Sequence, residues 1–98
     1  KLAVALMDIG RQIPAELNWV LRVDGHTDSV PISTAQFPSN WHLASDRAIS
    51  VVNFLISQGI PGERLVAAGF GEHHPLDTSG TLAANQRNRR IELKLTER

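Results

Sequence analysis

Asp28 and Arg47 are the two residues of this sequence whose types and settings suggest binding chemistry. Asp28 ends the stretch 19–28, which begins with the alternating apolar and polar residues of a strand, and Arg47 lies near the start of the helix-like stretch 40–58. A strand end and a helix start can meet at one edge of a sheet. A carboxylate and a guanidinium there would bracket a molecule that carries both an ammonium and a carboxylate. The backbone end of a free amino acid carries both of these groups.

The same two residues could instead form a structural ion pair between a loop and a helix. Arg47 lies one turn from Leu43 and one turn from Val51, at the margin of the predicted buried face. A guanidinium buried there needs a partner, because an unpaired buried charge is strongly destabilising. Asp28 is the leading candidate for that partner. The residues alone favour this structural pair, which would also be compatible with a ligand that parts it.

The elements that must position these charges follow from hydrophobic periodicity and from turn residues. The second helix is expected to be capped by Ser39 or Asn40, with Asn40 favoured, and to stop at Gly59. The full prediction is a helix over 1–13, a half-buried strand over 19–24, a proline-containing loop over 29–39, a helix over 40–58, a short strand over 64–70, a short helix over 82–87 and a final strand around 90–96.

Strand and helix alternate along the chain, which predicts an α/β (α+β) two-layer sandwich. A small mixed sheet would be covered by helices on one face and exposed to water on the other. Three strands make a thin sheet, and a further strand is expected before the first helix. The sequence begins in mid-helix, so we interpret residues 1–98 as a single domain from a longer chain. An upstream segment or a partner chain would complete its sheet.

Composition excludes several classes of function. Ten acidic and ten basic residues balance, whereas a nucleic-acid-binding domain normally carries a basic face. There is no cysteine, and hence no disulfide framework or thiolate metal site. No apolar run is long enough to cross a bilayer, so any contact with a membrane is expected through segments outside this sequence.

Two clusters superficially suggest a metal site or a catalytic site. In the turn Glu72–His74, adjacent side chains splay apart, and no pair of histidines at helical spacing is available to complete a metal site. His42, Ser45 and Asp46 have the residue types of a hydrolase triad, but all three fall within about one helical turn and no nucleophile elbow is present. We therefore expect no metal, no cofactor and no enzymatic activity.

A series of short motifs resembles the OmpA-like C-terminal domain over nearly the whole chain from residue 19 onward. Each motif is weak alone, but their shared order makes the resemblance specific. The loop segments Val30–Ile32 and Phe37–Trp41 look most like the MotB branch, the stator proteins of flagellar motors. The motifs are Gly25–Asp28, Asn40 with Leu43, Arg47 with Ala48 and Val51, Gly59 with Ile60, Arg64 with Leu65, Gly69–Glu72, Pro75 and Asn88–Glu92.

The resemblance implies a non-enzymatic domain of the periplasm, able to form a homodimer, that anchors a larger protein to the cell wall. In this family the ligand is peptidoglycan, bound non-covalently through the diaminopimelate of its peptide stem. By position in the motifs, Asp28 corresponds to the residue that receives the ammonium, and Arg47 to the residue that clamps the carboxylate. Asn40, Thr27 and Arg89 correspond to further pocket positions. With the resemblance, ligand binding is favoured over a purely structural ion pair.

Some positions depart from the family pattern or carry their own expectations. Ala44 replaces a usual Ser, which would remove one hydrogen bond at the helix cap or ligand, and Asn85 replaces a common Arg. Arg89 is in phase with Ile91 of the last strand and is expected to point toward the helix layer. Trp41 is expected to pack the helix start against the loop rather than to stack on sugars.

The alternative to a wall-binding domain is a protein-interaction or dimerisation module of the same fold that has lost wall binding.

Overall fold

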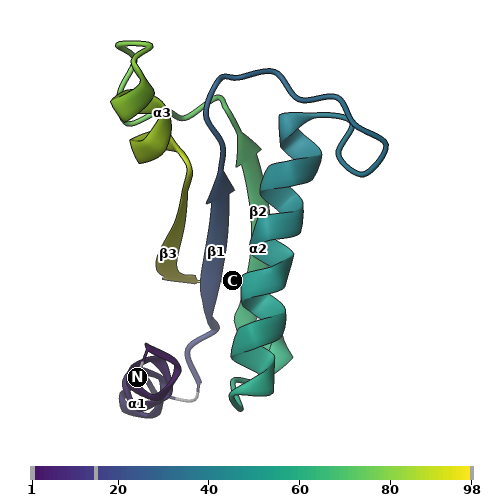
Figure 1. Cartoon of the computed structure of the whole chain (residues 1–98). Helices are drawn as coiled ribbons and strands as arrows, with labels where there is room; N and C mark the ends of the chain where they lie inside the picture. The colour runs from purple at the N-terminus through teal and green to yellow at the C-terminus, as the bar shows by residue number, and fades with distance from the viewer. Residues whose placement is uncertain (1, 15, 98) are drawn as a thin grey trace.

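The computed structural model describes residues 2–14 and 16–97, and within the first helix several side chains lie outside this description. Its elements confirm the predicted α/β class (Figure 1). No helix in these two ranges has both the length and the apolar content needed to span a bilayer. In order, the elements are α1 (Leu2–Gln12), β1 (Trp19–His26), α2 (Asn40–Ser57), the 3-10 turn η1 (Gly62–Arg64), β2 (Leu65–Gly71), α3 (Leu82–Asn88) and β3 (Arg90–Glu97).

The described strands form one mixed sheet in the order β2-β1-β3. β1 pairs in parallel with β2 and antiparallel with β3, so that Leu21 lies opposite both Leu65 and Leu95. Because parallel neighbours cannot be joined by a tight turn, the chain crosses over between β1 and β2, and α2 is that crossover. Figure 1 shows α2 lying along the sheet beside β1 and β2, with the connection 29–39 projecting past its start.

The core forms where α2 packs on β1. Val23, Ala48 and Leu55 are fully buried there, with Leu21 and Ile60 beside them. Burying side chains of this size is the main favourable term in folding a small domain, at about 1.5–3 kcal/mol for each large one.

The first turns of α2 approach the sheet so closely that only glycine fits beneath them. A Cβ on Gly25 would overlap the carbonyl oxygen of Ala44, and a Cβ on Gly69 would overlap Ser45 Oγ. Ala44 is itself fully buried in this contact. It is not among the residues that line the candidate binding cavity described below. The departure at Ala44 is therefore a packing feature of the helix–sheet contact.

The other face of the sheet carries charged residues, as the alternation predicted, but two of them are buried. Asp24 is 1% exposed and receives a fork of hydrogen bonds from Arg22 Nε and Nη2, at 2.7 and 2.9 Å. His26 is 4% exposed and stacks on Phe70 with 5.1 Å between ring centroids. Neither ring nitrogen of His26 has a hydrogen-bond partner among the described residues. Burial lowers the pKa of His26, and Arg90 lowers it further, while Glu92 and Asp24 oppose these effects.

The helix–sheet contact predicts an asymmetry between two glycines. We expect Gly25→Ala to lower the free energy of unfolding by about 1–3 kcal/mol, because the added methyl group meets backbone that must shift. Gly62→Ala is the matched control, since a Cβ there comes no closer than 3.9 Å to Ile56 Cδ1. Chemical denaturation measures both variants. Equal stabilities would contradict the close approach.

The burial of His26 predicts that stability depends on pH. The pKa of His26 is lower in the folded protein than in the unfolded chain. As the pH falls through the ordinary histidine value of 6.5, the unfolded chain therefore binds a proton at His26 before the folded protein does. The free energy of unfolding therefore declines as the pH drops below that value toward the lowered pKa. His26→Phe keeps the stack on Phe70 and removes the titrating group, so part of this decline is expected to disappear. His73→Phe, at an exposed histidine, is the control. Chemical denaturation at pH 7.5 and pH 5 gives the loss of stability between the two values for each protein. The same loss in wild type and in both variants would refute the prediction.

Candidate functional site

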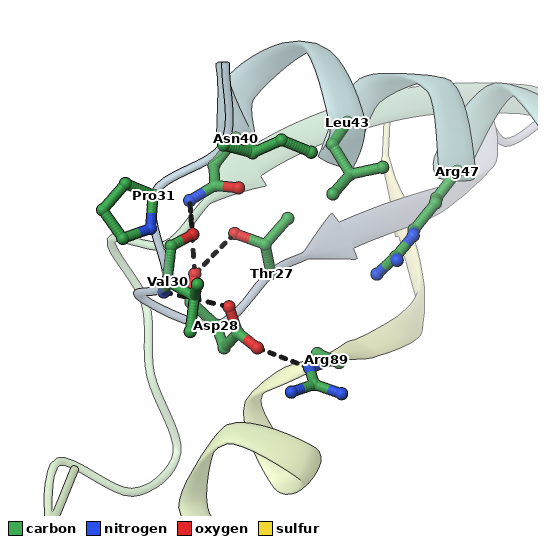
Figure 2. A pocket seen from close by; sticks show the side chains of 9 residues that line it. Thr27, Asp28, Val30, Pro31, Asn40, Leu43, Arg47 and Arg89 are labelled. Atoms are coloured by element: carbon green, nitrogen blue, oxygen red, sulfur yellow. Dashed lines mark hydrogen bonds and ion pairs between the residues drawn. The ribbon is translucent and has the colours of Figure 1, made fainter. Parts of the chain in front are cut away.

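A cavity of about 230 Å³ lies at the carboxyl end of β1, bounded by the loop after it, the start of α2 and the segment that joins α3 to β3. All five residues singled out in the sequence line it (Figure 2). Asn40, Leu43 and Arg47 reach it from α2, whereas Arg89 reaches it from the opposite side. The lining residues are Thr27, Asp28, Val30, Pro31, Ile32, Asn40, Leu43, Arg47 and Arg89.

The carboxylate of Asp28 is buried and held by hydrogen bonds. Its Oδ1 accepts from the backbone N–H of Val30 at 3.0 Å, and its Oδ2 accepts from Arg89 Nε in an ion pair. The hydroxyl of the buried Thr27 donates to the Asp28 carbonyl oxygen at 2.9 Å. These contacts fix the orientation of the acid before any other group approaches, which is the condition for a specific charged contact.

Asn40 holds the loop instead of capping the helix, so the preference for Asn40 as the cap is wrong. Ser39 is the cap: its backbone is extended and its Oγ accepts from the N–H of His42 at 3.4 Å. The buried Asn40 side chain directs Nδ2 at the carbonyl oxygens of Asp28 and Val30, at 3.4 and 3.2 Å. It also lies 3.3 Å from Oε1 of Glu72, a contact that sequence reasoning missed.

Arg47 does not pair with Asp28, and the predicted structural ion pair is wrong in this respect. The residue is exposed, and within the described part of the chain it takes part in no ion pair. The helical pattern put Arg47 at the margin of a buried face, but the residue lies on the solvent side of that margin. A solvated guanidinium needs no internal partner. In Figure 2 it extends from α2 into the same cavity, opposite the Asp28 carboxylate.

Arg89 is the residue that pairs with Asp28, across 61 positions of sequence. It lies between α3 and β3 as the C-terminal cap of the helix, and its side chain is 44% exposed. Arg89 thus lies outside β3, but it lines the same cavity as Asn40 and Arg47 of α2 and pairs with Asp28, as expected for a site residue rather than a solvated charge. The buried Asn88 beside it fixes this corner, since its Oδ1 accepts from the N–H groups of Leu76 and Asp77 at 2.9 and 3.1 Å.

A second cluster of ionisable groups lies on the opposite face of the sheet. Asp24, His26 and Glu92 place one potential metal-ligand atom each within 4.8 Å of one another. Arg22 already pairs with Asp24, while Arg90 and Lys94 pair with Glu92. The hydrogen bond from Arg90 lowers the pKa of Glu92 and keeps it ionised. A divalent cation would meet three positive side chains here, so electrostatics disfavours it.

The sheet order, the crossover helix and a charged cavity directly after the Gly25–Asp28 motif define one class of small α/β domain. The chain belongs to the OmpA family, whose model matches residues 3–89. It is 35% identical over 77 residues to motility protein B of Bacillus subtilis, a match covering 78% of this chain and 30% of that protein. The chain spans about a third of the length of the curated relatives it matches first.

Solved structures share this fold, and two of them bear on its function. The C-terminal domain of Helicobacter pylori MotB superposes with a TM-score of 0.81 at 25% identity, over 99% of this chain and 72% of that one. The cell wall anchor of the T6SS from Pseudomonas aeruginosa gives a TM-score of 0.75 at 30% identity, over 98% of this chain and 64% of that one. The predicted resemblance to the OmpA family and its MotB branch is confirmed.

Proposed function

We propose that this domain binds peptidoglycan non-covalently, through the diaminopimelate of the peptide stem, and anchors the protein that carries it to the cell wall in the periplasm. The observation that carries the proposal is one cavity that contains a held carboxylate, Asp28, and an exposed guanidinium, Arg47. Membership of the OmpA family and similarity to a cell wall anchor support it.

The free end of diaminopimelate carries an ammonium and a carboxylate, and the cavity offers one complementary group to each. Asp28 accepts from the ammonium, while Arg47 donates to the carboxylate with the two parallel bonds that a guanidinium allows. Charge-assisted hydrogen bonds of this kind contribute roughly 1.5–3 kcal/mol each. Affinity at one site is therefore modest, and many such domains on one polymer gain strength through avidity.

Thr27 and Asn40 act on this ligand through Asp28. Both donate to the carbonyl oxygen of Asp28, and Asn40 also reaches Val30, so they fix the loop from which the carboxylate projects. Ligand groups then meet an acid that is already oriented, which reduces the entropy lost on binding.

Binding at this site is proposed to be non-enzymatic. The Thr27 hydroxyl is committed to a backbone carbonyl, and the cavity lining includes neither a histidine nor a serine that could form a nucleophile–base pair with it. His42, Ser45 and Asp46 lie on α2 outside this cavity. An acid held by hydrogen bonds beside two arginines suits recognition of a zwitterion better than bond cleavage.

Arg89 makes recognition depend on both charges of the ligand. Its guanidinium bonds the Asp28 Oδ2 atom that the ammonium would use, so an incoming ammonium competes with it. Once released, Arg89 lies within the same cavity as Arg47 and can donate to the ligand carboxylate. A ligand with an ammonium alone must displace Arg89 without giving it a new partner.

Retention on purified sacculi tests the pair of charges. Asp28→Asn keeps an oxygen acceptor for the Val30 N–H and removes the charge, and Arg47→Gln removes the guanidinium. We expect each to weaken retention by about tenfold or more, from the loss of a charge-assisted bond. Glu63→Gln and Lys94→Gln, at exposed residues outside the cavity, are the matched controls and should bind as wild type. Equal retention of all five proteins would refute the site and favour an interaction or dimerisation module.

Arg89→Gln tests the dependence on two charges. Stem peptides with diaminopimelate or with lysine at the same position differ by the side-chain carboxylate, since lysine keeps only the ammonium. By calorimetry, wild type is expected to prefer the diaminopimelate peptide, and Arg89→Gln to lose part of that preference while binding the lysine peptide more tightly. Arg87→Gln, on α3 and paired with Asp77 outside the cavity, is the control. An unchanged preference in Arg89→Gln would contradict the competition.

A further inference from the structure

A second hollow lies on another side of α2, against the end of the loop 29–39. Its volume is about 440 Å³, larger than that of the Asp28 cavity. Phe37, Trp41 and Ile49 form its apolar surface. Polar groups come from four further residues, Gln36, His42, Ser45 and Asp46. None of these seven residues lines the Asp28 cavity.

The indole of Trp41 is exposed yet held in place. It is 52% exposed, and it stacks on His73 with 4.8 Å between ring centroids and an interplanar angle of 27°. The backbone of Gly71, at φ +64°, lies against the same indole, and a Cβ there would be 3.5 Å from two indole carbons. Covering the open face of this indole would be favourable, and a ring already fixed by its neighbours loses little entropy when a ligand covers it.

We infer that this hollow is a subsite for the sugar rings of an N-acetylated glycan. A pyranose ring has an apolar face of C–H groups that packs flat on an indole, and a rim of hydroxyl and amide groups that hydrogen-bond to side chains like those of Gln36, Ser45 and Asp46. No lysine or arginine lines the hollow, so it offers little to a phosphate or another anion. A protein partner would need roughly 800 Å² on each side, much more than this hollow presents.

The two sites border the same loop and the same helix, which supports one polymer as the ligand of both. Both use the loop 29–39, through Ile32 in one and Phe37 in the other, and both use the first turns of α2. Figure 1 shows this loop projecting past the start of α2. The identity of the glycan rests on the proposed function: in peptidoglycan, sugars and stem peptides are covalently joined, so one polymer can occupy both sites and gain avidity.

A peptide-free oligosaccharide tests this subsite separately from the Asp28 cavity. The chain has two tryptophans, so Trp19→Phe leaves Trp41 as the only indole and makes its fluorescence specific. Titration of that protein with a tetramer of β-1,4-linked N-acetylglucosamine is expected to give a saturable change. By calorimetry, Trp41→Ala in the otherwise wild-type chain is expected to weaken the affinity at least tenfold. Phe54→Ala, at an equally exposed aromatic of α2 outside the hollow, is expected to stay within twofold.

Retention of the cavity ligand shows that the variants are folded. Trp41→Ala should bind the diaminopimelate stem peptide as wild type, because Trp41 does not line that cavity. No saturable binding of the tetramer, or equal affinities for wild type and Trp41→Ala, would overturn the subsite, while Asp28-dependent retention on sacculi would leave the proposed function intact. Conversely, Trp41-dependent binding of the tetramer without Asp28-dependent retention would support the subsite and refute the peptide cavity.

Discussion

The close approach of α2 to the sheet determines where the charges of this domain can meet. Gly25 and Gly69 leave no Cβ beneath the first turns of the helix, so the backbone at Ala44 lies directly on β1. That depth brings Asn40 within hydrogen-bonding distance of the loop after β1, and it puts Arg47 on the rim of the cavity that Asp28 lines. A side chain at Gly25 would push the helix away from the sheet and increase the distance between the Asp28 carboxylate and the Arg47 guanidinium. The close packing of small residues is therefore what allows these two charges to line one cavity.

The cavity combines one carboxylate with two guanidinium groups, of which one is paired and one is solvated. Arg89 is engaged with Asp28, while Arg47 is solvated, so the acid is neutralised and one positive charge remains at the mouth. Under the proposed function, this remaining charge would attract the ligand carboxylate over a range of about 8 Å, the screening length at physiological salt. The exchange of Arg89 for the ligand ammonium at Asp28 would then require direct contact.

Periodicity predicted most of the elements because it reflects local chemistry. The helix expected over 40–58 is observed as Asn40–Ser57, and the strand expected over 64–70 as Leu65–Gly71. The order of the family motifs also identified five residues that line one cavity. The pairings within it were not predictable, because they depend on how distant elements cover each other. Arg47 was expected at the margin of a buried face with Asp28 as its partner, but it is exposed and Asp28 pairs with Arg89.

An error of one residue had larger consequences at the site than in the fold. The phase of the final strand indicated that Arg89 is a site residue, but not that it caps α3 and pairs with Asp28. Placing the cap at Asn40 instead of Ser39 hid the contact with Glu72. The cluster of Asp24, His26 and Glu92 depends on the register between β1 and β3, which pairs Asp24 with Glu92 and is not encoded locally.

The bond between Asp28 and Arg89 joins the loop after β1 to the residue before β3. In the folded domain Arg89 is held beside the acid by the pairing of β3 with β1 and by the hydrogen bonds of Asn88 to the segment after β2. A chain that is still being synthesised, or one whose last strand has detached, presents an incomplete cavity. Under the proposed function, only the fully folded domain would bind its ligand, and the bound ligand would in turn stabilise the folded state by mass action.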